Sequence, residues 1–225
     1  MLPLAERLRP KTLKEYIGQK HLVGEGAILR QMIENGNLSS FILWGPPGVG
    51  KTTLARIIAH ELERPFYTLS AVTSGVKEVR EVIEKAKRFV SMNSGLFSAS
   101  SGQENRSPIL FIDEIHRFSK SQQDSLLGAV EEGTITLIGA TTENPSFEVI
   151  TPLLSRCQVY VLKSLEKADL QELLQRALTE DAHICSLGID MKETESILRY
   201  SGGDARKLLN IVELVTNSGV KVIDN

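Results

Sequence analysis

The segment that most constrains how this chain folds is rich in glycine and ends in a lysine and a threonine: Gly45-Pro46-Pro47-Gly48-Val49-Gly50-Lys51-Thr52. It fits the pattern G-x-x-x-x-G-K-[S/T] and stands between an apolar run and a helical pattern, which is the context that this phosphate-binding loop requires. Backbone N–H groups of such a loop turn toward phosphate oxygens, and the following helix directs its positive end at them. We therefore expect the loop, with Thr53 beside it, to bind the phosphates of a nucleotide; a glycine-rich turn without a ligand is the alternative.

Two side chains at the end of the loop and two acids further along predict how the phosphates are handled. Lys51 is expected to reach the β- and γ-phosphates, and the Thr52 hydroxyl is expected to ligate Mg²⁺. Asp113 and Glu114 follow the apolar run ILFI, and alternation along a strand gives them different directions. Asp113 is predicted to lie at the Mg²⁺, and Glu114 is predicted to polarise the attacking water. A solvated acidic pair at a strand end is the alternative.

Short apolar runs alternate with helical patterns over most of the chain. The runs cover residues 41–44, 66–70, 109–112, 135–140 and 159–162. Strands that are apolar on both faces and are separated by helices form parallel sheets covered on both sides. The sequence therefore predicts an α/β core over residues 1–163, with a five-stranded parallel sheet between helices. Residues 92–108, rich in Ser, Gly and Asn, are expected to form a surface loop or insertion.

From residue 164 onward the pattern is helical. Ser164 is a candidate N-cap for a helix that places Leu170, Leu173, Leu174 and Leu178 on one face. A second helix is expected to end at Gly202-Gly203, and Asp204 is expected to cap a third. Residues 164–225 are therefore predicted to form a small all-helical domain. The chain ends in VKVIDN without an evident closing element, which suggests that it is a fragment.

Composition and charge exclude several classes of protein. The chain has 225 residues, a net charge of −2 and 41% hydrophobic residues, which is ordinary globular composition. No apolar run is long enough for a transmembrane helix, and the charged N-terminus does not fit a signal peptide. Cys157 and Cys185 are too few for a disulfide framework, so we expect a cytoplasmic protein with two free thiols. Overall charge does not indicate nucleic acid, so any DNA contact must come from local patches.

Several segments resemble one branch of the AAA+ ATPases. They are PLAERLRP, YIGQKHL, ILWGPPGVGKTTLA, AVTSGVKEVR, FIDEIHRFSKSQQD, GTITLIGATTENPSFE, LLSRCQVYVLKSL and GDARKLLN. Together they resemble the replication-associated recombination protein A family, also called maintenance of genome stability protein A, and its eukaryotic relatives, the Werner-helicase-interacting proteins. The resemblance implies a P-loop AAA+ core followed by a helical lid, with ATP and Mg²⁺ as ligands.

The resemblance also implies roles for residues that the spacing alone leaves open. Thr141 is similar to sensor 1, which reads the γ-phosphate, with Thr142 as the fallback. Arg156 is similar to the arginine finger that is donated to the neighbouring subunit's nucleotide. Arg206 is similar to sensor 2, which reaches the phosphates from the lid.

Three further positions are implied by the same resemblance. Tyr16 and Ile17 are expected to flank the adenine. Ser70 aligns with the polar residue that restrains the catalytic glutamate when DNA is absent. No catalytic role is assigned to His116 or Arg117.

The function implied by the resemblance is that of a DNA-dependent ATPase in replication-fork maintenance, recombination and DNA repair. Its implied partners are DNA forks, gaps or ends, and single-stranded DNA-binding protein. Family members form homo-oligomers, implied to be tetramers, through a helical region that would follow the lid. Two alternatives remain: a clamp-loader-type subunit, and a non-hydrolysing ATP-dependent adaptor. Residues 77–88 are a candidate DNA-facing helix, although their mixed charges also fit a solvated face.

Overall fold

One parallel sheet forms the centre of the larger part of the molecule. The computed structural model describes residues 2–71, 74–97, 107–218 and 222–223. The strands lie in the order β2-β3-β4-β1-β5, and all neighbours are parallel. Their bounds are β1 Phe41–Trp44, β2 Phe66–Ser70, β3 Ile109–Asp113, β4 Thr136–Thr141 and β5 Gln158–Val161. Each predicted strand is present, and its ends lie within one residue of the prediction.

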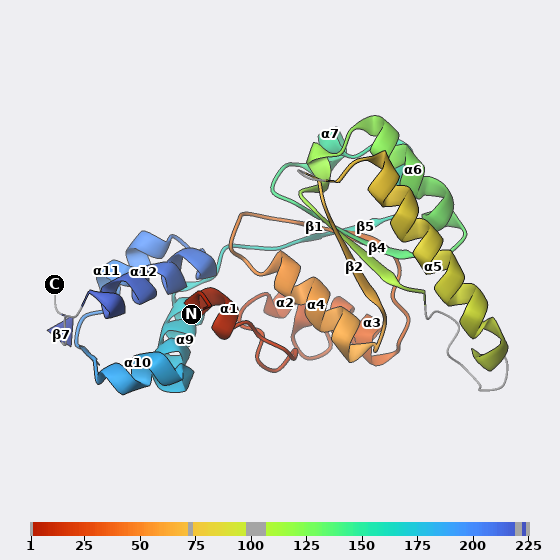
Figure 1. Ribbon diagram of the computed structural model, residues 1–225. Coiled ribbons are helices and arrows are strands. Elements are labelled where there is room, and N and C mark those ends of the chain that lie inside the picture. Colours follow the sequence, from red (N-terminus) through yellow and green to blue (C-terminus); the bar gives the residue numbers. More distant parts are fainter. Residues whose placement is uncertain (1, 72–73, 98–106, 219–221, 224–225) are drawn as a thin grey trace.

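Helices cover both faces of this sheet, as the doubly apolar strands predict. One face carries α2 (Lys20–Val23), α3 (Ile28–Glu34) and α4 (Lys51–Glu61), and the other carries α5 (Val76–Phe97) and α6 (Lys120–Glu131) (Figure 1). Successive strand residues serve opposite faces: Phe41 and Leu43 pack with the first group, whereas Ile42 packs with the second. The α/β sandwich is therefore confirmed.

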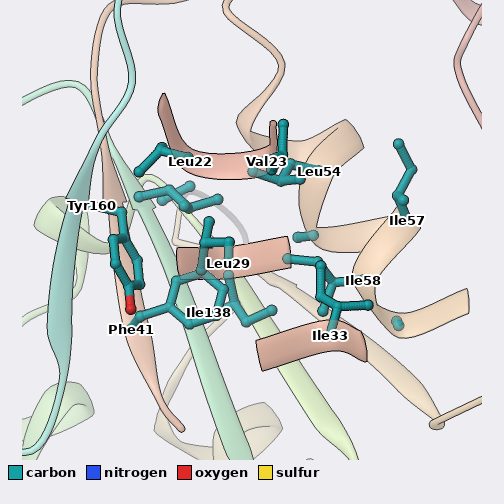
Figure 2. Close-up of a cluster of buried hydrophobic side chains, with 14 of the residues drawn as sticks. Leu22, Val23, Leu29, Ile33, Phe41, Leu54, Ile57, Ile58, Ile138 and Tyr160 are labelled. Atoms are coloured by element: carbon teal, nitrogen blue, oxygen red, sulfur yellow. The ribbon is translucent and has the colours of Figure 1, made fainter. Parts of the chain in front are cut away.

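The cluster on the first face shows how the strand and helix patterns combine. Apolar side chains of α3 and α4, including Leu29 and Leu54, point toward the sheet residues Phe41, Ile138 and Tyr160 (Figure 2). The Phe41 and Tyr160 rings meet edge to face, with centroids 5.4 Å apart. Burying these side chains removes the exposed apolar surface that the sheet alone would present to water.

The strand order brings three functionally important strand ends together. Because β4 lies between β1 and β3, the loop after β1 shares one edge of the sheet with Asp113 and Thr141. Trp44 pairs in register with Thr141, and Ser70 pairs with Asp113. In open parallel sheets the carboxyl edge is where ligands bind. The strand that ends at Thr141 and the strand that ends at Asp113 are therefore neighbours in the sheet.

A second group of helices follows the sheet and has its own core. The helices are α9 (Lys167–Glu180), α10 (Ala182–Leu187), α11 (Glu195–Ser201) and α12 (Ala205–Asn217). Leu170, Leu173 and Leu174 are buried among them. Gly202 ends α11 in a left-handed conformation, and the Asp204 side chain accepts a hydrogen bond from the Lys207 N–H at 2.9 Å. Both predicted helix boundaries are therefore confirmed. We call this group, residues 164–218 and 222–223, the lid.

The lid differs from its predicted form in three ways. The N-cap of α9 is Glu166 rather than Ser164, because Glu166 and Asp169 form a reciprocal capping box. Helix α10, which Asp181 caps, was not predicted from the sequence. The all-helical prediction is wrong, since β6 (Asp190–Met191) pairs in parallel with β7 (Val222–Ile223) within the VKVIDN ending. Two-residue strands are too short to show a periodic pattern.

The first residues of the chain pack with the lid and not with the sheet. Helix α1 (Leu4–Arg7) lies against α12, and Leu4 and Leu8 belong to the lid's hydrophobic cluster. The Arg7 guanidinium donates to both carboxylate oxygens of Asp181, at 2.7 and 3.0 Å, and to Glu213 at 3.0 Å. The predicted boundary between the core (residues 1–163) and the helical domain (residues 164–225) thus assigns residues 4–8 to the core, although they pack with the lid.

The segment 92–108 also differs from its prediction. Helix α5 continues to Phe97, so the first residues of the predicted loop are helical. No proline interrupts residues 76–97, and small polar residues alone do not stop a helix. Residues 98–106 lie outside the described part of the chain. Within the described residues, no helix has the length and apolarity needed to cross a bilayer.

Candidate nucleotide site

A pocket lies where the phosphate loop, the carboxyl edge of the sheet and the lid meet. Its walls are formed by Ala5, Leu8, Arg9, Pro10, Tyr16, Ile17, Pro47, Gly48, Val49, Gly50, Lys51, Thr52, Thr53, Asp113, Glu114, Leu165, Leu173, Ala205, Arg206 and Leu209. Residues from the chain's start, middle and end therefore surround one space. Most residues predicted to contact nucleotide or Mg²⁺ are among them.

Two glycines of the loop occupy positions that other residues would not fit. Gly48 has a φ of +68°, and a Cβ there would collide with the Asp204 carboxylate. Gly50 has a φ of +95°, and a Cβ there would lie 2.7 Å from the Tyr16 hydroxyl. Glycine adopts positive φ readily because it lacks a Cβ. The loop conformation and its close packing against the lid thus both depend on glycine.

Lys51 is held at the mouth of the loop. It begins α4, its exposed fraction is 8%, and its Nζ donates to the carbonyl oxygens of Gly45 at 2.7 Å and Pro46 at 2.8 Å. Burial lowers the pKa of Lys51, and the nearby carboxylates of Glu114 and Asp113 partly oppose that shift. Phosphate oxygens entering the pocket would supply the negative charge that best suits this ammonium group.

The donor set for Mg²⁺ matches what that ion takes beside a nucleotide. The Thr52 hydroxyl and the Asp113 carboxylate line the same pocket and both offer oxygen. Mg²⁺ is usually bound by one or two carboxylates together with phosphate oxygens and water. No cluster of three or more acidic, histidine or cysteine side chains suited to a metal is found among the described residues. An ion here would therefore complete its coordination with the nucleotide and water.

Glu114 lies in a network that joins two strand ends. Its φ of +53° is unusual for a residue with a side chain, and it precedes the short helix η1 (Ile115–Arg117). Its Oε2 lies 3.2 Å from Nδ1 of His116 and 3.5 Å from the Thr142 hydroxyl. His116 Nδ1 is also 3.0 Å from the Thr141 hydroxyl. The Glu114 carboxylate is thus connected to both candidate sensor 1 residues.

Thr141 is buried behind the pocket wall. Its exposed fraction is zero, and its hydroxyl also exchanges hydrogen bonds with the backbone of Glu143 at 3.0 and 3.1 Å. Ser70 ends β2 in register with Asp113, and the N–H of Ala71 donates to the Asp113 carbonyl at 3.3 Å. Thr141 and Ser70 are therefore next to the acids without themselves lining the pocket.

The N-terminal segment forms the wall that was expected to meet the adenine. Tyr16 is buried and its hydroxyl donates to the Val49 carbonyl at 3.2 Å; burial raises the pKa of this phenol. Arg9 donates to the Thr53 hydroxyl at 3.2 Å and pairs with Glu6. Ile17 lines the pocket and packs against the lid cluster. This segment therefore links the loop to the lid.

The lid contacts the loop directly through the start of α12. The Ala205 N–H donates to the Gly48 carbonyl at 3.1 Å, and the next residue, Arg206, lines the pocket. Its positive charge also contributes to the lowering of the Lys51 pKa, after burial. A movement of α12 would thus strain or break the hydrogen bond to Gly48 and change the position of Arg206 relative to the phosphate loop.

Arg156 lies apart from this pocket. It follows α8 (Thr151–Leu154), is 37% exposed at the side chain, pairs with Glu131 of α6, and donates to the Pro152 carbonyl at 2.6 Å. It lines a different surface hollow, together with Ser39, Ser40, Ser107 and Thr136. The structure thus does not bring Arg156 to the nucleotide pocket of its own chain.

Sequence reasoning missed two sets of residues. The apolar side chains of Leu165, Leu173 and Leu209 line the pocket from the lid, but the sequence pattern placed only Leu173 on an apolar helix face and gave none of the three a role at the pocket. His116 links Glu114 to Thr141, and its position two residues after the acid was a signal that was not used.

Because Arg206 of the lid and the acids of the core line the same pocket as the phosphate loop, fold and site together define a P-loop ATPase with a helical lid. The sequence model of the "ATPase family associated with various cellular activities (AAA)" matches residues 41–165, and the chain belongs to this family.

Comparison with individual proteins shows which members of the AAA family this chain is similar to. Replication-associated recombination protein A of Escherichia coli K12 is 48% identical, over 98% of this chain and 49% of that protein. The ATPase WRNIP1 of Dictyostelium discoideum is 44% identical, over 94% of this chain and 23% of that protein. The resemblance inferred from the motifs is thereby confirmed. The chain spans about half the length of the bacterial recombination proteins that it matches.

Solved structures show the same fold. RuvB of Thermotoga maritima, a Holliday junction branch migration motor, matches with a TM-score of 0.70 and 29% identity. The match covers 96% of this chain and 69% of RuvB. The helical lid is therefore included in the likeness, together with the sheet.

Proposed function

We propose that this chain binds ATP with Mg²⁺ and hydrolyses it in a DNA-dependent manner, as part of replication-fork maintenance, recombination and DNA repair. The observation that carries the proposal is the convergence of Lys51, Glu114 and Arg206 on one pocket between core and lid. A protein that only bound nucleotide would not need, beside the phosphate loop, an acid that can activate a water for attack on the γ-phosphate. The names of the relatives support the biological setting.

In the proposed mechanism each residue has a separate task. The loop N–H groups and Lys51 hold the phosphates, and Thr52 with Asp113 would hold Mg²⁺, which neutralises charge on the transferred phosphoryl group. Glu114 orients the attacking water and accepts its proton. Arg206 contacts the phosphates from the lid, so lid position and phosphate state are coupled.

We further propose that the site is completed by a second copy of the chain. Arg156 lies outside its own pocket, is partly exposed and is held by Glu131. An arginine supplied by a neighbour would stabilise charge in the transition state, as arginine fingers do elsewhere. A homo-oligomer, a tetramer by resemblance, would therefore hydrolyse ATP faster than isolated chains. Forked, gapped or free-ended DNA and single-stranded DNA-binding protein are the proposed partners, in the bacterial cytoplasm.

The experiment that tests this proposal measures steady-state ATPase activity with and without forked or gapped DNA. It is done on this chain and on a C-terminally extended chain, with Lys51→Ala as the inactive reference. We expect DNA to stimulate the extended chain. Tight ATP binding without hydrolysis in either chain would instead indicate an adaptor, and hydrolysis that DNA alone leaves unchanged would contradict DNA dependence and reopen the clamp-loader alternative.

A further inference from the structure

His116 occupies a position between the proposed base and the proposed sensor. Its side chain is 14% exposed, and it comes from η1, directly after Glu114 and Ile115. One ring nitrogen, Nδ1, lies 3.2 Å from Oε2 of Glu114 and 3.0 Å from Oγ1 of Thr141. Glu114 directly follows β3 and Thr141 ends β4, so a single atom lies between residues at the ends of two neighbouring strands.

The hydrogen-bonding capacity of the partners determines where the proton lies. An ionised carboxylate only accepts, so a bond between Glu114 and Nδ1 requires a proton on Nδ1. The Thr141 hydroxyl has one proton, and the Glu143 carbonyl at 3.1 Å can only accept it. The Thr141 oxygen is then an acceptor for both the Glu143 N–H and His116. Nδ1–H therefore stands between two acceptors.

We propose that His116 is a positioning residue that holds the Glu114 carboxylate in one orientation and couples it to Thr141. Because one N–H cannot point well at two acceptors, a stronger bond to one weakens the bond to the other. A change in the Thr141 hydroxyl, such as donation to a phosphate oxygen, therefore changes how firmly Glu114 is held. This inference rests on the proposed roles of Glu114 and Thr141 in ATP hydrolysis.

The strained backbone of Glu114 supports this interpretation. A non-glycine residue at φ +53° costs about 1–3 kcal/mol unless its surroundings stabilise it. The left-handed conformation turns the chain directly into η1, and this turn brings the His116 ring back toward the Glu114 side chain. The 3.2 Å approach of Nδ1 of His116 to Oε2 of Glu114 is thus a consequence of the turn that follows the acid.

The first test does not depend on enzymatic activity. In the nucleotide-free chain at pH 8, nitrogen-15 NMR of the histidine rings reports which ring nitrogen carries the proton, with His116→Leu used to assign the signal. We expect His116 Nδ1 to be protonated. An unprotonated Nδ1 overturns the proposal, because that nitrogen could not then donate to the Glu114 carboxylate. This result is independent of whether the proposed ATPase function is correct.

The second test separates positioning from folding. His116→Leu should lower kcat about 10- to 100-fold, because a misplaced Glu114 carboxylate no longer orients the attacking water. KM for ATP should stay within about twofold, since the phosphate contacts remain. His116→Asn places an amide N–H near the position of Nδ1–H and should recover most of the activity. His60→Leu, on the exposed end of α4, is the control for loss of a histidine.

Coupling to Thr141 is tested by a double-mutant cycle. If the two residues act together, His116→Leu should have a smaller effect in a Thr141→Val background than alone. The proposal is overturned if His116→Leu hydrolyses ATP like the parent, if His116→Asn is as impaired as a folded His116→Leu, or if the cycle is additive. An inactive parent in the same assay would instead count against the proposed function.

Discussion

Buried charge at Lys51 is the feature of single residues that most directly predicts a ligand. The ammonium group is almost fully buried and donates to two loop carbonyls, yet these neutral oxygens do not balance its charge. Burial lowers its pKa, and the carboxylates of Glu114 and Asp113 only partly restore it. A buried cation gains most from a fully charged partner, and triphosphate oxygens fit that requirement.

Replacing Lys51 by alanine should therefore weaken ATP binding at least about tenfold, because hydrogen bonds to charged groups contribute about 1.5–3 kcal/mol each. Isothermal titration calorimetry of ATP with the variant and the parent measures this change. Lys14→Ala, at an exposed position, is the matched control. An unchanged ATP affinity in Lys51→Ala would contradict the proposal that this loop binds the phosphates of ATP.

Glu114→Gln should separate binding from hydrolysis. Glutamine keeps the size and hydrogen-bonding capacity of the side chain but cannot accept the proton of the attacking water. Hydrolysis should fall about 10²- to 10⁴-fold. Affinity for ATP should change little, since Glu114 is not expected to hold the phosphates. Loss of ATP binding in this variant would show that Glu114 has a structural or Mg²⁺-binding role instead.

At the scale of elements, the sheet was predictable and part of the lid was not. The inner strands β1, β3 and β4 are buried on both faces and leave continuous apolar runs. All five predicted runs were found within one residue of their ends. Helix α10 has six residues, and the strands β6 and β7 have two each, so none of them leaves a readable period. The N-cap of α9 was misplaced because a glutamate capping box resembles ordinary surface charge. Short elements depend on tertiary contacts that a local pattern does not contain.

In the candidate site, too, residues next to predicted strands could be placed from the sequence, whereas residues positioned by tertiary contacts could not. Loop residues and acids adjoin predicted strands, so their spacing placed them at one sheet edge. The contributions of Leu173 and Leu209 could not be predicted, because they depend on how the lid sits against the core. The position of His116 two residues after the acid was visible in the sequence, but its approach to Glu114 depends on the left-handed turn there, which no sequence pattern showed.

The ion pair between α1 and the lid should make stability depend on pH. Hydrogen bonds from Arg7 lower the pKa of Asp181, so the ionised form stabilises the folded state. That contribution is complete above the carboxyl's unfolded pKa of about 3.9 and is lost as pH falls through the lowered folded value. Asp181→Asn should cost about 1–3 kcal/mol at pH 7, because it removes charged hydrogen bonds.

Urea unfolding of the parent and the variant at pH 7 and at low pH measures this effect. The stability difference between them should shrink as the medium is acidified. Asp124→Asn, an exposed aspartate on α6, should show no such difference. A difference for Asp181→Asn that stays constant down to low pH would contradict the proposed role of the pair.

At the scale of the whole molecule, core and lid meet at the pocket, whereas Arg156 lies outside the pocket and pairs with Glu131. The Gly48–Ala205 hydrogen bond joins the loop to α12, and the N-terminal segment runs from the lid cluster to the loop. ATP binding should therefore fix the position of the lid relative to the sheet. Because Arg156 pairs with Glu131 on the outer surface, it is available to a neighbouring chain only after that pair opens.

Mixing two inactive variants tests most directly whether the site is shared between chains. Arg156→Ala keeps an intact pocket, and Lys51→Ala keeps an intact arginine, so each alone should lack most hydrolysis in an assembling, C-terminally extended chain. We predict that Arg156→Ala binds ATP within a few-fold of the parent and that mixed assemblies regain measurable ATPase activity. If both variants are folded and assemble together, yet the mixture remains inactive, then Arg156 does not act on a neighbour's ATP and the shared site is contradicted.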